Sequence, residues 1–150
     1  MMIANYLQRL FLGIWIGEMV FFAAVFAPRV FRVLTRQDAS KLQNAIFPPY
    51  FMLGLICAAV IALTLIFARP TGTKLIVALV CLVLAAGIFA YSRAVYTPKI
   101  AALAAIITDP AQAASVTDAM KEEFASLHKA SVRTNGVSLF ALLGLLGALL

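Results

Sequence analysis

Four long apolar segments occupy most of this 150-residue chain and constrain its fold more than any motif does. They lie at about residues 7–27, 48–68, 75–96 and 130–150. A helix that crosses a bilayer needs about 20 mainly apolar residues, so four crossings use most of the chain. With 64% hydrophobic and 12% charged residues, a soluble globular domain is excluded. We therefore predict an all-α polytopic membrane protein, a single four-transmembrane-helix bundle over residues 1–150.

The last segment is continuously apolar only from Gly136 to Leu150, a stretch that rises about 22 Å as a helix and is too short to span. The spanning helix must therefore start near residue 130, which brings Ser131, Arg133 and Asn135 into the near side of the membrane. We expect the Arg133 side chain to extend toward the lipid headgroups.

The connection before this span is predicted to be an amphipathic cytoplasmic helix, from about 110 to 129, that continues into the span. Its apolar positions are spaced by three and four residues: Ala113, Val116, Met120, Phe124 and Leu127. The first connection is predicted to hold a short helix, 38–46, with Asp38 as its cap. The six prolines, at positions 28, 48, 49, 70, 98 and 110, are expected at or beyond helix ends. No internal repeat is recognisable.

The basic residues are distributed unevenly between the two ends of the predicted bundle. Nine of the twelve Lys and Arg residues lie in or beside the first and third connections, and three lie on the opposite side. Because cytoplasmic loops carry an excess of Lys and Arg, we predict cytoplasmic connections, with both termini outside a bacterial inner (plasma) membrane. The net charge of +6 fits attraction to anionic lipid and not to nucleic acid, because no interleaving of aromatic and basic residues suggests a base-stacking surface.

Glu18 is the only charged residue in the apolar stretch 11–27. An acidic or basic residue at the centre of a spanning helix costs roughly 2.5–3.5 kcal/mol, so it usually faces the protein interior and marks a functional path. Gly13 and Gly17 form a GxxxG motif beside it, which is typical of close helix packing within a bundle or between protomers. Such packing would bury Glu18 in an interface or a cavity.

A second polar cluster precedes the last span. Phe124, His128, Ser131 and Asn135 are spaced by four, three and four residues, so they share one helix face. This face either holds the bundle together by interhelical hydrogen bonds or lines a pocket open to the cytoplasm. Our hypothesis is a polar cavity that joins the two clusters, with an arginine at its mouth. Its predicted residues are Glu18, Arg29, Arg93, His128, Ser131 and Asn135.

No cofactor, metal or catalytic motif is legible in the sequence. Cys57 and Cys81 lie inside predicted spans without CxxC spacing, and we interpret them as packing residues. His128 is the only histidine, which excludes a bis-histidine haem within one chain, and a zinc site would lack ligands. We therefore predict no cofactor and a protein that is not an enzyme.

Several elements of the sequence occur in a familiar order. They are Pro28-Arg-Val-Phe31 followed by Leu34, Phe47-Pro-Pro-Tyr-Phe51, Pro98, and His128-x-x-Ser131-x-x-x-Asn135. Together they resemble the TMEM205-like (DUF4149) family, and the resemblance spans nearly the whole chain. It implies a small four-span membrane protein. The family is largely without an assigned biochemical activity, so the resemblance leaves the chemistry open.

Three functional hypotheses follow. The first is a small transporter or transport accessory, working as an oligomer, because a carboxyl that changes protonation at mid-membrane is what a proton-coupled carrier needs. The second is a non-catalytic scaffold or assembly subunit that binds a membrane partner protein through the GxxxG motif and the amphipathic helix. The third is an intramembrane enzyme acting on a lipid or quinone, with Glu18 and His128 as acid and base.

Overall fold

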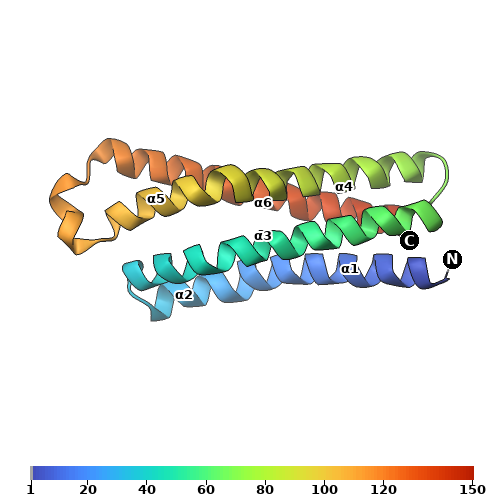
Figure 1. Ribbon diagram of the computed structural model, residues 1–150, viewed down its shortest axis with the longest axis horizontal. Coiled ribbons are helices and arrows are strands. Elements are labelled where there is room, and N and C mark those ends of the chain that lie inside the picture. Colours follow the sequence, from blue (N-terminus) through green and yellow to red (C-terminus); the bar gives the residue numbers. More distant parts are fainter. Residues whose placement is uncertain (1) are drawn as a thin grey trace.

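The computed structural model describes residues 2–150 as a bundle of long helical segments, and no strand occurs in this range (Figure 1). Four segments are long and apolar enough to cross a membrane: Met2–Val33, Arg36–Phe67, Thr73–Ile107 and Asp118–Leu149. The all-α fold with four spanning helices is confirmed. A helix of 32 residues rises about 48 Å, well beyond a hydrocarbon core of about 30 Å, so each segment continues outside the core.

Two of the four segments contain an internal π-helix. The first segment consists of α1 (Met2–Phe21), η1 (Phe22–Phe26) and α2 (Ala27–Val33). The third consists of α4 (Thr73–Tyr91), η2 (Ser92–Tyr96) and α5 (Thr97–Ile107). A proline stands in the first turn of both α2 and α5, inside a continuous helical segment, so our expectation that these two prolines lie at or beyond helix ends is wrong.

The π-helices explain how the chain stays helical through Pro28 and Pro98. A proline inside an α-helix lacks a donor, and its ring clashes with the carbonyl four residues before it. Each π-helix inserts one extra residue just before the proline and is closed by a bond that spans five residues, from Ala27 N to Phe22 O and from Thr97 N to Ser92 O. The helix therefore continues with its register shifted.

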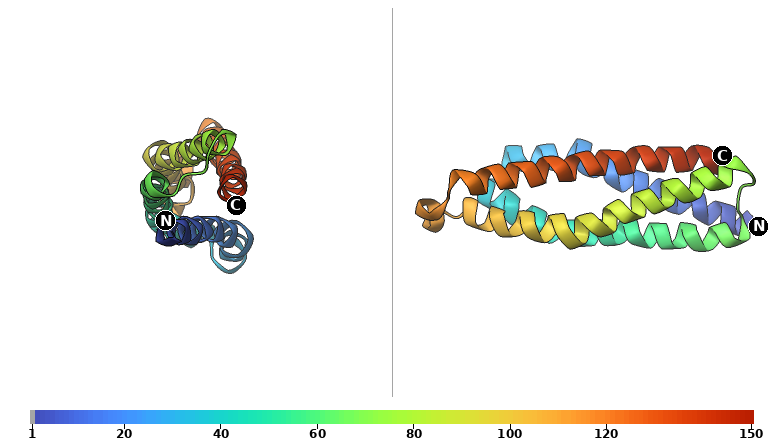
Figure 2. Two further views of the ribbon diagram at one scale, coloured as in Figure 1. Left: turned by 90° about the vertical axis from the view of Figure 1, so that its right-hand side faces the viewer. Right: turned by 90° about the horizontal axis from the view of Figure 1, so that it is seen from above.

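The π-helices reveal an internal repeat that sequence reasoning missed. The two π-helices lie 70 residues apart in similar sequences, Ala24-Val-Phe-Ala-Pro28 and Ala94-Val-Tyr-Thr-Pro98. α1 packs on α3, and α4 packs on α6, so each π-helix belongs to one of two helical hairpins in the bundle. Seen end-on, the four segments surround the bundle axis, and both termini lie at the same end (Figure 2).

The second segment is one uninterrupted helix, α3 (Arg36–Phe67). Its cap is Thr35 and not Asp38, because the Thr35 hydroxyl accepts a hydrogen bond from the Asp38 amide at 3.2 Å. The short helix predicted at 38–46 is the first part of α3, which continues through Pro48 and Pro49. The expectation that these two prolines lie at or beyond a helix end is therefore also wrong.

The third connection contains a 3-10 helix, η3 (Pro110–Ser115), followed by α6 (Asp118–Leu149). Thr117 caps α6 by accepting a hydrogen bond from the Met120 amide at 3.3 Å. The predicted amphipathic helix thus continues into the last span, as expected, but it begins at Asp118 and not near 110. The Asp109 carboxylate accepts a hydrogen bond from the Ala111 amide at 3.0 Å, which favours the 3-10 helix η3 over an α-helix at this position.

The tightest packing in the core lies where α1, α3 and α4 meet. The Trp15 and Phe89 rings are edge to face, with centroids 5.2 Å apart, and both side chains are fully buried. Gly54 of α3 lies against both rings, where a Cβ would collide with Phe89 and Trp15. At the end near the termini, Gln8 Nε2 donates to the Ala68 carbonyl at 2.8 Å and joins α1 to the end of α3.

Candidate functional site

A cavity of about 710 Å³ lies between the helical segments. Its lining residues belong to the half of the bundle that carries the first and third connections, which is the left half of the ribbon in Figure 1. Its wall comes from the first segment, α3, α5 and α6. The polar lining residues of α3 and α6 are Arg36, Ser40, Gln43, Asn44, Tyr50, His128, Ser131 and Asn135. Most of the remaining lining residues are apolar or aromatic. The cavity therefore combines polar and apolar surface.

The structure places the predicted helix face of α6 on the wall of this cavity. Phe124, His128, Ser131 and Asn135 all line it. The Phe124 and His128 rings stack with centroids 6.0 Å apart and an angle of 8° between their planes. These residues descend one side of the cavity because spacings of four, three and four keep them on one face of an α-helix.

The inner end of the cavity contains a hydrogen bond between α3 and α6. The Tyr50 hydroxyl donates to Asn135 Oδ1 at 3.3 Å. Tyr50 is only 6% exposed and packs against the rings of Phe22, Phe51 and Phe89, with centroids 4.9, 5.0 and 5.5 Å from its own. Sequence reasoning did not select Tyr50 as a site residue. The available signal was its place in the Phe47-Pro-Pro-Tyr-Phe51 motif.

Glu18 is not among the residues that line the cavity, contrary to the prediction, whereas Met19, the next residue of α1, does line it. The Glu18 side chain is half-buried, and Oε2 is buried without a hydrogen-bond partner among the described residues. Trp15 Nε1 and Ser138 Oγ are also buried without a partner in the described part of the chain. The bundle interior therefore holds polar atoms with unused hydrogen-bonding capacity.

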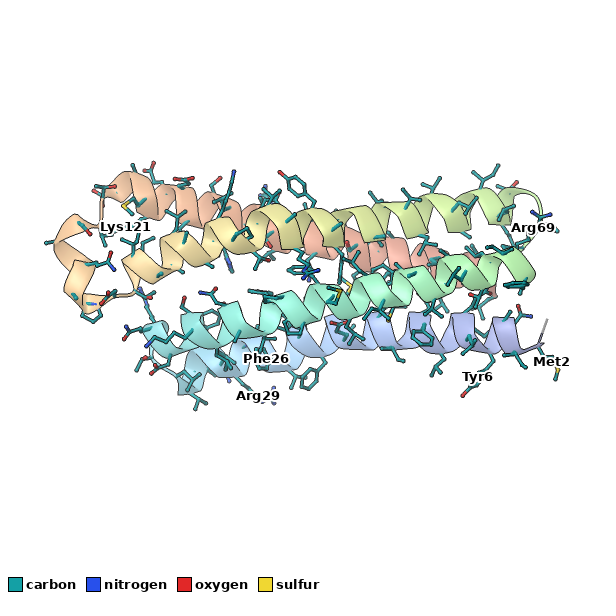
Figure 3. The ribbon with its side chains drawn as sticks, viewed as in Figure 1. Met2, Tyr6, Phe26, Arg29, Arg69 and Lys121 are labelled. Atoms are coloured by element: carbon teal, nitrogen blue, oxygen red, sulfur yellow. The ribbon has the colours of Figure 1, made fainter. Side chains whose placement is uncertain are left out.

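The two arginines predicted at the mouth do not reach the cavity. Arg29 is exposed on the outside of α2 (Figure 3). Its Nη1 donates a hydrogen bond to the Val25 carbonyl at 3.2 Å. Arg93 is exposed in η2 and its Nη1 lies 3.7 Å from the Met52 sulfur. Both predictions are wrong, and the arginine that lines the cavity is Arg36.

The cause of this error is the π-helix between Glu18 and Arg29. A separation of eleven residues returns to the same face only in a regular α-helix. One extra residue in η1 rotates all later positions by about 100° around the helix axis. Arg29 is thereby turned away from the face that carries Glu18.

Gly13 and Gly17 lie on the outer surface of α1. Both are exposed, and a Cβ at either position would meet open space. The motif therefore does not pack against another helix of the described chain, and the interpretation as a contact within the bundle is wrong. Packing between protomers stays a prediction. The glycine that permits close helix packing within the bundle is Gly54.

Arg36 is the one residue of the cavity lining that carries a formal charge at pH 7. No Asp or Glu is among the lining residues, and Arg36 has no ion pair within residues 2–150. The one ion pair in this range joins Lys121 and Asp118 at 3.0 Å on the surface of α6. In the same range no group of three His, Cys, Asp or Glu side chains is arranged to hold a metal ion.

The profile of the family described as "Domain of unknown function (DUF4149)" matches residues 10–108. The chain belongs to the DUF4149 family. The matched part of this DUF4149 chain includes α3, with Tyr50, but ends before α6, which carries His128, Ser131 and Asn135. The family description assigns no activity.

An uncharacterized protein of Aquifex aeolicus (strain VF5) is 36% identical to the DUF4149 chain over 61 residues. The match covers 41% of this chain and 44% of the relative, so the chain spans less than half the length of that relative. No solved structure matches the chain.

Proposed function

We propose that this protein is a small membrane transporter or transport accessory that holds its solute in the cavity between the four segments. The single observation that supports this proposal is the cavity itself, about 710 Å³ with a polar wall on α6 and α3. Ligand sites in proteins are typically concave, with volumes of about 300–1,000 Å³ and a few placed polar groups in an apolar lining. An interior cavity of this size serves little purpose in a protein that only holds helices together.

Glu18 is proposed as the group that couples solute movement to protons. Its half-buried carboxyl has one buried oxygen without a hydrogen-bond partner among the described residues, and the next residue of α1, Met19, lines the cavity. Ionisable residues inside a membrane bundle commonly belong to proton relays. A carboxyl at this position can take up a proton when the cavity is open to one side and release it when the access changes.

The test is uptake by proteoliposomes under an imposed pH gradient, with a panel of organic acids, amino acids and organic cations. We expect at least one solute to accumulate with the wild-type protein but not with Glu18→Gln. Glu122→Gln, an exposed carboxylate on α6, is the matched control and should retain uptake. Equal uptake by Glu18→Gln contradicts the coupling role. No uptake above empty liposomes contradicts transport by this chain alone.

A second candidate function is a non-catalytic scaffold or assembly subunit. It is favoured by Gly13 and Gly17, which expose a small-residue face on the outside of α1 where another spanning helix fits closely. The partner would be a second copy of this chain or another membrane protein. Loss of a copurifying protein in Gly13→Leu, with retention in Glu18→Gln, supports this function. The reverse pattern contradicts it.

We also propose that the protein is of the TMEM205-like type and that it is not an enzyme. Its proposed location is a bacterial inner membrane. The proposed orientation has both termini outside and the connections in the cytoplasm. It is supported by the cluster of basic residues at the connection end, where Arg29, Arg32, Arg36 and Lys41 follow one another. The cavity would then open toward the cytoplasmic side.

A further inference from the structure

One side of the cavity is not closed by helix packing. In the described chain α2 contacts only η1 and α3, and it makes no contact with α5 or α6. The cavity nevertheless extends from Ala27 and Phe31 of α2 to Val132 and Gly136 of α6. Its counterpart in the other hairpin, α5, packs against both α3 and α6. The two hairpins thus differ here, and the unsealed side faces the surrounding lipid when the bundle lies in a bilayer.

The length of the cavity fits a single hydrocarbon chain. It extends along α3 from Arg36 to Phe51 and along α6 from Phe124 to Leu139. Fifteen residues of helix rise about 22 Å, whereas the hydrocarbon of one leaflet is about 15 Å thick. The cavity therefore extends from the connection end toward the middle of the bundle and is long enough to hold one hydrocarbon chain.

The two ends of the cavity differ in chemistry. Arg36 and His128 line the part of the cavity nearest the connections, here called the outer part, and the amide side chains of Gln43 and Asn44 line the same wall on α3. The inner part is built around aromatic rings, with the Phe47 and Phe51 rings stacked 5.9 Å apart. With an arginine and no carboxylate in the lining, the outer part favours an anion. Apolar surface farther in favours a hydrocarbon chain.

We propose that the cavity binds a single-chain amphiphile with an anionic head group, which enters from the bilayer between α2 and α6. The head group lies against the Arg36 guanidinium, and the chain lies along the aromatic inner wall. Arginine suits this position because its planar guanidinium donates two parallel hydrogen bonds to a carboxylate or a phosphate. This inference rests on the proposed function, because it names the chemical class of the solute that the cavity holds.

The experiment is photo-crosslinking with a diazirine-bearing hexadecanoate, using the full chain in phosphatidylcholine nanodiscs and mapping the labelled peptides. We expect label on the cavity segments of α3 and α6, and competition by hexadecanoate at a concentration at least tenfold lower than by the neutral hexadecanol. Lysophosphatidylglycerol is the third competitor. If it competes better than hexadecanoate, the preferred head group is a phosphate, and if it competes less well, the preferred head group is a carboxylate.

Two glycines of α6 provide a matched pair of variants. A Cβ at Gly136 or at Gly147 would meet open space, so neither substitution collides with the fold at that atom, but only Gly136 lines the cavity. We expect Gly136→Leu to lower cavity labelling at least tenfold and Gly147→Leu to leave it unchanged. Arg36→Gln should remove the preference for hexadecanoate over hexadecanol, whereas Arg32→Gln, outside the cavity lining, should preserve it.

Equal labelling of the two glycine variants, or equal competition by acid and alcohol in the wild-type protein, would overturn the proposal. Its failure is distinguishable from failure of the transport function. If specific labelling is absent while solute uptake is intact, the proposed amphiphile site is contradicted and the transport function is supported. If specific labelling occurs without solute uptake, the binding site is supported and the transport function is contradicted.

Discussion

The Tyr50 hydroxyl donates a hydrogen bond to Asn135 Oδ1 at 3.3 Å, and this contact joins α3 to α6 at the inner end of the cavity. The bond therefore connects the polar face of α6 to the Phe47-Pro-Pro-Tyr-Phe51 motif of α3. The bond also limits how far α3 and α6 can separate at this depth.

Tyr50→Phe is expected to lower stability by about 0.6–1 kcal/mol, because hydrogen bonds between membrane helices contribute about that much. The phenyl ring keeps the aromatic packing and removes only the donor. Unfolding by sodium dodecyl sulfate in mixed micelles measures the change. In a double-mutant cycle with Asn135→Ala the two changes should not add. Full additivity would show that the bond contributes nothing to stability.

Gly54→Ala is expected to destabilise the bundle by about 1–3 kcal/mol, because the added methyl group collides with the Trp15 and Phe89 rings. Gly147→Ala is the control, since a Cβ there meets open space. Thermal unfolding of the two purified variants compares them directly. Equal midpoints would mean that α1, α3 and α4 do not meet as closely as the structure shows.

Gln8→Leu should cost about 1–2 kcal/mol. The substitution removes the donor to the Ala68 carbonyl and leaves that buried acceptor without a partner. Asn5→Leu, an exposed position one turn earlier in α1, should change stability little. Proteolysis of the connection between α3 and α4 offers a local measurement, with faster cleavage expected only for the Gln8 variant. Similar cleavage rates would contradict the role of this bond.

The turn at η3 should depend on pH through Asp109. Hydrogen bonds from the Gln112 side chain and the Ala111 amide, together with nearby Lys41, hold the Asp109 pKa below its ordinary value of 3.8. Because the folded-state pKa is the lower one, the stabilisation is fully present above about pH 3.8 and is lost as the pH falls through the folded value. The Ala111 amide shift in nuclear magnetic resonance spectra should follow this titration, and Asp109→Asn should abolish it.

The fold was predictable because four apolar segments in a chain of this length leave few alternatives. The polar face of α6 was predictable for a related reason, since spacings of three and four residues determine a face in any regular helix. The π-helices were not predictable, because Pro28 and Pro98 predict helix ends when local propensity alone is considered. Tertiary packing keeps both segments helical through these prolines. The predicted positions of Arg29 and Arg93 at the mouth of the cavity are therefore wrong.

The cavity that Ser131 and Asn135 line is proposed to be open to water at the connection end of the bundle. Substituted-cysteine accessibility tests it most directly, in a background of Cys57→Ser and Cys81→Ala. Membranes are treated from the connection side with a charged, impermeant thiol reagent. Val137→Cys, an exposed residue of the same helix outside the cavity lining, is the control. Ser131→Cys and Asn135→Cys are expected to react at least tenfold faster than Val137→Cys. Equal rates at all three positions would contradict the proposed opening.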